Sequence, residues 1–314
     1  MHAIYKDLDI LIIGSFMMDL VVRTPRVPEN GETIIGSSFR RFPGGKGANQ
    51  AVSAARLGGN VTMVGKLGSD LFGDEMQTVL NNEGINTRYI LRDGQAPTGV
   101  GFVTLDEKTG NNRIVVVPGA NLCYRPADLS AIRHVVENSD ILVLQLEMDM
   151  DLIETAVMIG AEAQVPVILN PAPAQELDDA LLNKVTYLTP NETEAEILTG
   201  VEVTDIQTAK AAAHILRKRG VRNVVMTLGE NGALIVGANG IEHVPAFPTS
   251  VVDTVAAGDA FNGALAVAIA QGTPLTQAVR FANAVGALAV TKEGAIPSLP
   301  LLGEVNNFLS KHVS

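Results

Sequence analysis

The sequence predicts an α/β protein with a mainly parallel sheet that is covered by helices on both faces. Short runs of β-branched residues alternate with helical patterns along most of the chain. Such alternation is typical of strand–helix–strand units, whose crossovers place helices against a parallel sheet. With 314 residues, of which 46% are hydrophobic and 18% charged, the chain can bury a large core. This length allows one large domain with an accessory element, or two small domains.

The expected strands and helices follow one another in pairs. The predicted strand–helix pairs are residues 10–13 with 48–57, 61–64 with 72–82, 141–144 with 152–163, and 165–169 with 177–182, and a further strand is predicted at 224–228. From Gly258 onward the pattern is mostly helical, with helices expected over residues 258–271, 274–290 and about 302–312.

Two segments, residues 19–42 and 97–117, interrupt this alternation because both resemble strands joined by polar turns that contain glycine. They lie far apart in the sequence but are similar in type. They form either one small sheet that projects from the main domain as a lid, or ordinary edge strands of the main sheet. The pattern alone leaves both arrangements open.

Composition and charge narrow the class of partners. The chain holds 23 Lys and Arg against 34 Asp and Glu, a formal net charge of −11. This balance argues against nucleic acid or an anionic membrane as a partner, but not against a phosphate held by a helix start and one or two cations. The single cysteine, Cys123, cannot form an internal disulfide, and the five histidines show no zinc-site spacing. Acidic residues precede the apolar run at 10–13, which favours a buried strand over a secretory signal, and no apolar run is of membrane-spanning length. These features predict a soluble cytoplasmic protein.

The stretch VVDTVAAGDAFNG at residues 251–263 places Asp253 and Asp259 around three very small residues, directly before an apolar helix. A helix start exposes unpaired backbone N–H groups with partial positive charge. Asp259 could therefore be an ordinary first-turn carboxylate. That interpretation leaves Ala256, Ala257 and Gly258 unexplained, since their missing side chains leave bare amides that a phosphate can approach.

A second glycine-rich stretch, GGKGANQ at residues 44–50, precedes another helix. It lacks the spacing of a Walker A phosphate loop and of a dinucleotide-binding fingerprint. Its glycines, beside Lys46 and Asn49, could form a floor on which a small polar ligand lies close to the backbone. The alternative is a turn that only caps the helix.

Two later turns have the same ambiguity. Asn191 and Glu194 follow Pro190 with the spacing of a helix capping box, but the same side chains could organise a hydrated Mg²⁺ and phosphate oxygens. The segment at 227–232, TLGENG, follows a strand and is either a hairpin turn or a contact with nucleotide phosphates.

Taken together and in this order, these stretches resemble the ribokinase-like (phosphofructokinase B-type) carbohydrate kinases. The most specific pieces are GGKGANQAVSAARLG at 44–58, NPAPA at 170–174, PNETEAEILTG at 190–200 and VVDTVAAGDAFNG at 251–263, within a resemblance that extends from Ile10 to about Pro300. It implies a single three-layer αβα domain over residues 1–314, with a small β-sheet lid formed by residues 19–42 and 97–117. The lid of this family pairs two subunits, so the resemblance also implies a homodimer.

The resemblance further implies an ATP-dependent kinase that phosphorylates the 5-hydroxyl of ribose. Asp259 is the implied general base, and Ala256, Ala257 and Gly258 form the implied anion hole for the moving phosphoryl group. The implied sugar-binding positions, in addition to Asp259, are Met17, Asp19, Gly45, Lys46, Asn49 and Glu147.

The remaining implied roles concern the nucleotide and two metal ions. The implied nucleotide-binding residues are Asn191, Thr227, Gly229, Glu230, Gly232 and Asn283, and Glu194 is implied to organise Mg²⁺ indirectly. Two loops are implied to hold a monovalent cation, K⁺, mostly through backbone carbonyls; they contain Asp253, Val255, Ala289, Lys292, Gly294 and Ser298. From the residues alone, Asp253 could equally be a structural turn carboxylate, and Ala289 and Lys292 an ordinary helix end.

One position departs from the commoner family pattern. Met17, two residues before Asp19, stands where many members have asparagine, and methionine offers no proper hydrogen bond to a sugar hydroxyl. Members that have methionine here include some that act on 2-deoxyribose and some that act on ribose. The sequence therefore leaves the choice between ribose, 2-deoxyribose, a nucleoside or another furanose or ketose open. A phosphosugar is disfavoured because Arg40 and Arg41 are the only basic pair near the glycine-rich loop.

Two rival functions come from other classes. A catalytically silent sugar sensor with this fold would have no need of Asp259 and the small residues before it. A dinucleotide-dependent oxidoreductase shares the strand–helix alternation, but no GxGxxG follows the first strand. Both are therefore disfavoured.

Overall fold

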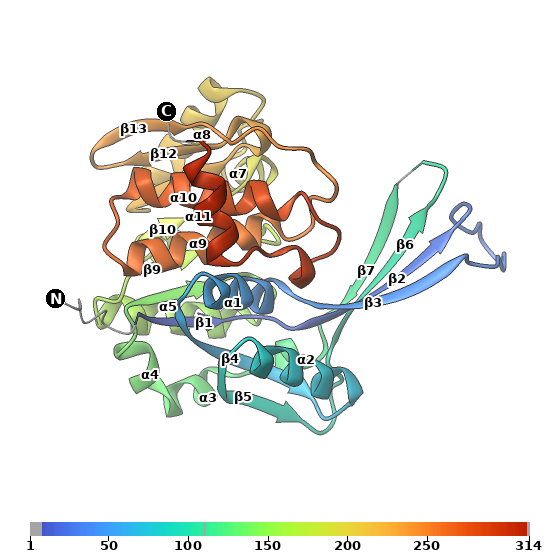
Figure 1. Ribbon diagram of the computed structural model, residues 1–314. Helices are drawn as coiled ribbons and strands as arrows, with labels where there is room; N and C mark the ends of the chain where they lie inside the picture. The colour runs from blue at the N-terminus through green and yellow to red at the C-terminus, as the bar shows by residue number, and fades with distance from the viewer. Residues whose placement is uncertain (1–7, 110, 313–314) are drawn as a thin grey trace.

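The computed structural model describes residues 8–109 and 111–312, so part of the N-terminal segment, residues 1–7, lies outside it. In the described chain a nine-stranded sheet has the order β13-β12-β11-β10-β9-β8-β1-β4-β5 (Figure 1). Its strands from β11 to β5 pair in parallel, while β12 and β13 pair antiparallel at one edge. The strands are β1 (Asp9–Ile13), β4 (Asn60–Gly68), β5 (Asn86–Asp93), β8 (Ile141–Leu144), β9 (Val167–Leu169), β10 (Tyr187–Leu188), β11 (Asn223–Thr227), β12 (Ala233–Gly237) and β13 (Gly240–Val244).

Helices cover both faces of this sheet, which gives the expected three layers. Along β1, Ile10 and Ile12 belong to one hydrophobic cluster while Leu11 and Ile13 belong to the other, because successive strand side chains point to opposite faces. The first cluster packs under α1 (Lys46–Arg56), α2 (Leu71–Asn82), α9 (Ala257–Ala270), α10 (Leu275–Ala289) and α11 (Leu302–Ser310). The second packs under α3 (Pro126–Ala131), α4 (Arg133–Glu137), α5 (Met150–Glu162), α6 (Asp179–Leu182), α7 (Glu192–Thr199) and α8 (Ile206–Lys218). Short 3-10 turns lie at η1 (Gly119–Cys123), η2 (Gly229–Asn231) and η3 (Ile296–Ser298).

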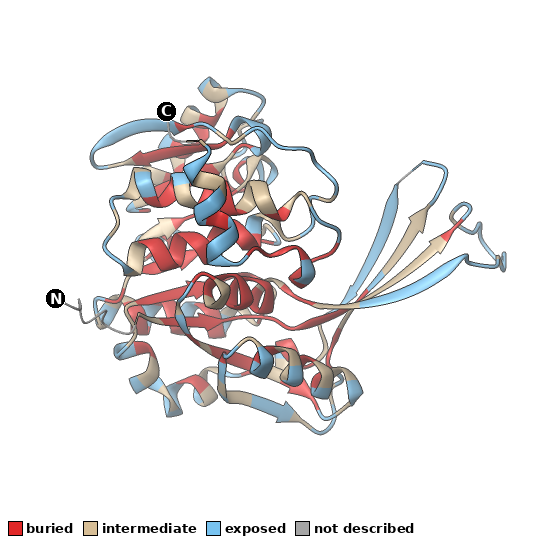
Figure 2. Ribbon diagram, in the orientation of Figure 1, coloured by how far each residue is buried: buried red, intermediate tan, exposed pale blue. Residues whose placement is uncertain are grey.

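The two interrupting segments form a separate four-stranded sheet, here called the lid sheet. Its order is β3-β2-β6-β7, and it contains β2 (Met17–Thr24), β3 (Ser38–Gly44), β6 (Gly99–Asp106) and β7 (Asn112–Val117). Figure 1 shows that it projects away from the main body, and Figure 2 shows that its strands are intermediate or exposed over most of their length. The alternative, edge strands of the main sheet, is therefore wrong.

Most element boundaries agree with the sequence prediction to within a few residues. The helix expected over 177–182 is shorter because Asp178 caps it, its side chain accepting from the N–H of Leu181 at 2.6 Å. No helix in the described part of the chain is long and apolar enough to cross a bilayer.

Candidate functional site

The start of α9 combines an exposed glycine with a buried carboxylate. Ala256, the residue before the helix, has a left-handed backbone with φ 61°, which turns the chain sharply into α9. The first N–H groups of a helix have no partner within it. A Cβ placed on Gly258 would meet no atom within 4 Å, so the protein itself does not require glycine there. The side of Gly258 on which a side chain would lie is therefore open and the residue is exposed, while the N–H of Ala257 donates to the carbonyl of Thr254 at 3.3 Å.

Asp259, in the first turn of α9, is only 7% exposed. Both of its carboxylate oxygens accept from amide side chains of α1, Oδ2 from Asn49 Nδ2 at 2.9 Å and Oδ1 from Gln50 Nε2 at 3.0 Å. Burial raises the pKa of Asp259, while the charge of Lys46 and these two hydrogen bonds act in the opposite direction. Asn49 and Lys46 are site residues predicted from the sequence, whereas Gln50 was not predicted, although it belongs to the same glycine-rich stretch.

The glycine-rich stretch lies beside Asp259. Gly45 has φ 94°, and a Cβ there would lie 2.7 Å from the backbone nitrogen of Met17, so only glycine fits this turn. Burial lowers the pKa of Lys46, but the negative charges of Asp259, Glu147 and Glu194 outweigh it, and the net direction is upward. Lys46 thus stays a cation among carboxylates.

Glu147 is held against this stretch from the loop after β8. Its Oε2 accepts from the backbone N–H of Lys46 at 3.1 Å and from the hydroxyl of Ser15, with which it makes a short hydrogen bond. Ser15 is fully buried and was not identified from the sequence. The only signal for it is its position at the end of the first strand, where polar residues of parallel sheets gather.

Asp19 lies on β2 at the base of the lid sheet, with two glycines of neighbouring strands against its carboxylate. A Cβ on Gly44 would lie 2.9 Å from Asp19 Oδ2, and one on Gly101 would lie 2.3 Å from Asp19 Oδ1. Burial, followed by the negative charge of Glu147, raises the pKa of Asp19 to about 6. Asn49 Oδ1 is buried and has no hydrogen-bond partner among the described residues, which leaves an acceptor in the same region.

Met17 lies two residues before Asp19 on β2, so its side chain shares the face of Asp19. It is 5% exposed, and its sulfur lies 3.9 Å from Asn121 Nδ2. Met18, on the opposite face, is fully buried in the chain interior.

Of the predicted nucleotide residues, Asn191 and Glu194 form the capping box of α7. Asn191 Oδ1 accepts from the N–H of Glu194 at 2.8 Å, and Glu194 Oε2 accepts from the N–H of Asn191 at 2.9 Å. Burial raises the pKa of Glu194. The predicted cap is thus confirmed, and it leaves Asn191 Nδ2 and the second Glu194 oxygen for other partners.

The segment 227–232 forms the turn between β11 and β12, as the hairpin interpretation expects. The N–H of Thr227 donates to the carbonyl of Pro190 at 2.9 Å, which joins this turn to the Asn191 loop. Gly229 and Glu230 are exposed, and Gly232 has φ 88°. Asn283, on α10, donates through Nδ2 to the carbonyls of Val244 and Pro245 at 3.1 and 3.2 Å. A Cβ on Gly232 would lie 2.2 Å from that Val244 oxygen, so Asn283 and the Gly232 end of the turn contact the same segment.

The two loops predicted to hold a monovalent cation are joined by Asp253. Its Oδ2 accepts from the N–H of Gly294 at 2.9 Å, and its Oδ1 accepts from the N–H of Val255 at 3.0 Å. Asp253 is therefore a structural turn carboxylate that also connects the loops. The Lys292 ammonium binds Glu304 on α11 at 2.9 Å. Ala289 and Ser298 are buried beside these loops.

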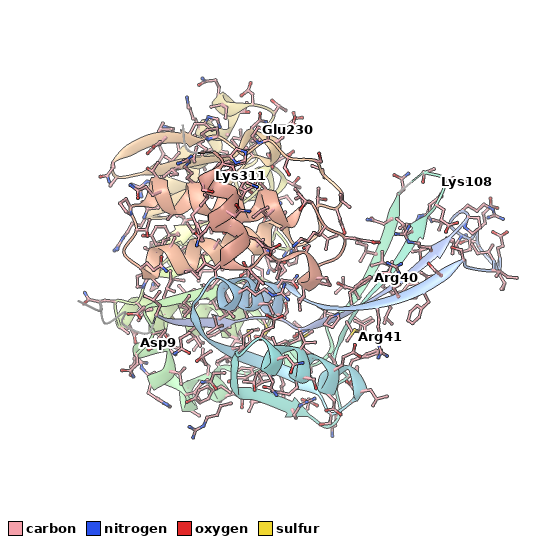
Figure 3. All side chains as sticks on the ribbon, in the orientation of Figure 1. Asp9, Arg40, Arg41, Lys108, Glu230 and Lys311 are labelled. Carbon is pink, nitrogen blue, oxygen red and sulfur yellow. The ribbon has the colours of Figure 1, made fainter. Side chains whose placement is uncertain are left out.

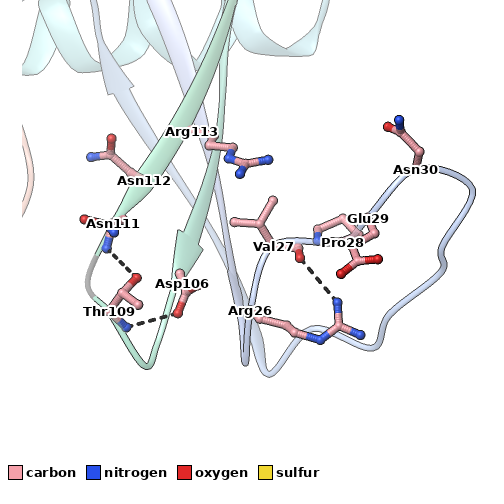
Figure 4. Close-up of a pocket in the computed structure, with 10 residues that line it drawn as sticks. All are labelled: Arg26, Val27, Pro28, Glu29, Asn30, Asp106, Thr109, Asn111, Asn112 and Arg113. Carbon is pink, nitrogen blue, oxygen red and sulfur yellow. Dashed lines mark hydrogen bonds between the residues drawn. The ribbon is translucent and has the colours of Figure 1, made fainter.

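Two cavities lie outside the cluster around Asp259. One, of about 730 Å³, lies between the tips of the lid strands (Figure 4) and is lined by Arg26, Val27, Pro28, Glu29, Asn30, Asp106, Thr109, Asn111, Asn112 and Arg113. None of these residues was predicted for the site. The other, of about 290 Å³, lies beside the turn after β11 and is lined by Glu192, Val203, Thr204, Asp205, Ile206, Leu228 and Asn231. No group of three His, Cys, Asp or Glu side chains in the described chain could hold a metal ion by itself.

The two arginines of the lid sheet are engaged by acidic residues. Arg41 binds Glu75 at 2.9 Å, and Arg40 lies 3.5 Å from Glu293. Figure 3 shows both on the lid sheet, with Lys108 nearer its tip and Glu230 on the main body. Each arginine is therefore already paired with a carboxylate and is not free to bind the phosphate of a phosphosugar.

An α/β fold that presents bare amides and a buried carboxylate at one helix start has the features of a phosphotransferase. Comparison with known proteins is more specific. Residues 7–302 match the model of the pfkB family carbohydrate kinases. The chain therefore belongs to the pfkB family of carbohydrate kinases.

Individual relatives cover nearly the whole chain. It is 40% identical over 298 residues to a ribokinase of Haemophilus influenzae (95% of this chain, 97% of the relative) and 38% identical over 304 residues to a deoxyribokinase of Salmonella typhi (96% and 99%). Among solved structures, an Arabidopsis thaliana ribokinase complexed with ribose and ATP superposes with a TM-score of 0.93 at 32% identity, covering 97% of this chain and 99% of that one.

Proposed function

We propose that this carbohydrate kinase transfers the γ-phosphoryl group of ATP to the 5-hydroxyl of ribose. The proposal rests on relatives that are ribokinases and on a structural neighbour complexed with ribose and ATP. One observation of the chain itself carries it: the buried carboxylate of Asp259 lies one residue after Gly258, which is exposed and open on its Cβ side in the first turn of α9. A base and an anion-binding helix start are then adjacent, as phosphoryl transfer to a hydroxyl requires.

In the proposed step, Asp259 takes the proton of the 5-hydroxyl as that oxygen attacks the γ-phosphorus. The new bond joins the sugar oxygen to phosphorus, and the bond between the γ-phosphorus and the bridging oxygen of ADP breaks. The electron pair of that bond leaves with ADP. The N–H groups at the start of α9 stabilise the negative charge on the transferred oxygens because they point toward it before the reaction begins.

The sugar would lie between the base of the lid sheet and α1. Asp19 supplies an acceptor, and Lys46 a donor, for hydroxyl groups. Asn49 Oδ1 has no partner among the described residues, although it is buried. A buried acceptor without a donor is unfavourable by about 1–3 kcal/mol, and either a sugar hydroxyl or, after the amide has turned over, a protonated Asp259 would satisfy it. Glu147 accepts from the N–H of Lys46 and thereby fixes the glycine-rich turn.

The residues present fit both predicted metal ions. Mg²⁺ is usually bound through one or two carboxylates together with waters and phosphates, so the second oxygen of Glu194 suits an indirect role. When bound, Mg²⁺ would neutralise charge on the phosphates. K⁺ would lie between the loops that Asp253 joins and would be held mostly by backbone carbonyls. Asn191, Thr227, Gly229, Glu230, Gly232 and Asn283 would contact the nucleotide.

2-Deoxyribose is the second candidate substrate. A relative that is 38% identical is a deoxyribokinase, and Met17 offers no hydrogen bond on the face of Asp19. The absence of a polar partner would weaken discrimination against the deoxy sugar.

We also infer a cytoplasmic homodimer that pairs through the lid sheets. The strand β7 lies at an edge of the lid sheet with four consecutive exposed apolar side chains, Ile114, Val115, Val116 and Val117. Such an edge favours pairing with another chain. The single Cys123 is consistent with a reducing compartment. Sedimentation at several concentrations, with Val116→Lys as the comparison, tests the dimer.

Asp259→Asn tests the function. The change keeps the size of the side chain and removes its basicity, so kcat for ribose should fall by roughly 10²–10⁴. ADP release with ribose and with 2-deoxyribose is measured together with a melting curve. A well-folded variant with near-normal kcat would show that Asp259 is not the base.

A further inference from the structure

We propose that Gln50 selects which oxygen of Asp259 acts as the base, by holding Oδ1 as a permanent hydrogen-bond acceptor so that Oδ2 receives the proton. Gln50 is then a positioning residue that does not itself touch the sugar. This inference rests on the proposed role of Asp259, and it adds the identity of the reacting atom and of the residue that determines it.

The direction of the hydrogen bonds begins at a backbone carbonyl. Asn170 Nδ2 donates to the carbonyl of Thr189 at 3.2 Å, and a carbonyl can only accept. This bond fixes the Asn170 amide, so its Oδ1 faces Gln50. Gln50 Nε2 lies 3.2 Å from that oxygen. The end of Gln50 that faces Asn170 and Asp259 is therefore its NH₂ group.

A second contact holds the other end of Gln50. Its Oε1 accepts from Gln145 Nε2 at 2.6 Å. Gln145 Oε1 has no partner among the described residues, so Gln145 could turn over together with Gln50, but Gln50 would then place its oxygen against Asn170 Oδ1 and Asp259 Oδ1. Gln50 is fully buried, and such a mismatch of buried polar atoms is unfavourable. Gln50 must then donate to Asp259 Oδ1, at 3.0 Å.

Asn49, which donates to Oδ2, is not fixed in this way. Its Nδ2 lies 2.9 Å from Asp259 Oδ2, but its Oδ1 has no partner among the described residues. The Asn49 amide can therefore turn over, and its oxygen can then accept from a protonated Oδ2. Of the two carboxylate oxygens, only Oδ2 has a neighbour that can accommodate both protonation states.

Charged groups from three other parts of the chain face Asp259. Lys46 on α1 favours the ionised carboxylate, whereas Glu147, after β8, and Glu194 on α7 oppose it. The hydrogen bond from Gln50 favours the ionised form and so lowers the pKa of Asp259. Loss of this bond should raise that pKa, and a base with a raised pKa becomes active only at higher pH.

The test is Gln50→Met, which keeps the length of the side chain and removes its amide. In the holoenzyme with ATP and Mg²⁺, kcat for ribose at neutral pH should fall by about tenfold to a hundredfold, the range expected for one lost hydrogen bond to a charged group. The acidic limb of the kcat profile should move to higher pH, while the KM for ribose changes little. A purely structural role would lower the melting temperature without moving the profile.

The matched control is Ser53→Ala. Ser53 is buried on the same helix, one turn later, and its hydroxyl donates to the carbonyl of Ala260 at 3.0 Å without touching Asp259. The Ser53→Ala variant should be less stable than the parent and should have the same pH profile of kcat. If Gln50→Met does not fold, Gln145→Met removes the hydrogen bond that holds the far end of Gln50 and should move the limb in the same direction by less.

Two outcomes separate the inference from the function on which it rests. If Asp259→Asn is inactive but Gln50→Met has the wild-type profile and a kcat within about twofold, the assignment of Oδ2 through Gln50 is overturned and the base remains. If Asp259→Asn is active, the proposed function itself fails. A shifted limb in Gln50→Met and an unshifted one in Ser53→Ala support the inference.

Discussion

Replacing Gly258 by alanine separates the needs of the fold from the needs of a bound phosphate. A new Cβ at Gly258 would meet no atom of the protein within 4 Å, and the residue lies in the first turn of α9 with an ordinary helical position. The protein therefore has no steric reason for glycine there. A phosphate that approaches the amide at hydrogen-bond distance would meet the added methyl group.

For Gly258→Ala we expect stability and turnover to change in opposite directions. Alanine is favoured over glycine inside a helix by about 1 kcal/mol at most, so the variant should be as stable as the parent or slightly more stable. Loss of one preorganised donor at a developing negative charge typically lowers kcat by about 10²–10³. The methyl group displaces the phosphate rather than removing the amide, so we expect a loss of about tenfold to a hundredfold.

The assay compares this variant with Gly303→Ala. Gly303 is the second residue of α11, as Gly258 is of α9, and a Cβ there also meets nothing within 4 Å. Melting curves of both variants should match or exceed that of the parent, and only Gly258→Ala should lose turnover. Full kcat in Gly258→Ala, with an unchanged KM for ATP, would refute the anion hole at this helix start.

Three further outcomes are expected. In the parent we expect kcat/KM to favour ribose over 2-deoxyribose by only about tenfold to a hundredfold, and Met17→Asn should widen this preference. Met18→Asn, on the opposite face of β2, should lower the melting temperature without changing the ratio of the two kcat/KM values. Equal ratios in all three proteins would show that Met17 is a packing residue. Burial raises the pKa of Asp19 to about 6, so the KM for ribose should rise as the pH falls through this value. Over the same range the folded state should gain stability, because native Asp19 binds its proton more tightly than unfolded Asp19. A KM for ribose that is constant from pH 7 to pH 5 would contradict a role of Asp19 in sugar binding. Activity at fixed Mg²⁺ should increase more with K⁺ than with Na⁺, because a cation between the loops joined by Asp253 would hold the start of α9; equal rates in K⁺ and in a bulky organic cation would exclude it.

The main sheet could be predicted because its pattern is local. Buried parallel strands such as β8, with four buried residues in a row, have a composition that differs plainly from that of the helices beside them. The strand β13 has four exposed residues out of five, and β10 is two residues long, so neither produces a readable pattern. The choice between a lid and edge strands depends on whether β2 pairs with β6 or with the main sheet, and pairing partners 82 positions apart leave no local trace.

The candidate site was predicted unevenly for the same reason. Asp259, Lys46 and Asn49 lie in short stretches whose glycines and alanines are unusual in themselves. Gln50 is next to Asn49, yet its role depends on Asp259, 209 residues away, and on Asn170, 120 residues away. A buried glutamine in a helix has no local pattern that distinguishes a structural contact from a functional one.

The burial of Asp259 explains why so many amides surround it. A carboxylate taken out of water strongly favours its neutral form, and a neutral carboxyl cannot act as a base. Exposure of Asp259 to solvent would avoid this cost, but water would then compete for the proton and would screen the charge of the phosphoryl group. Lys46, Asn49 and Gln50 offset part of this cost within the protein, because one positive charge and two donated hydrogen bonds favour the ionised form. Two donors with different freedom to turn are more useful than two identical ones, since a base must be held in place and must also change its protonation state.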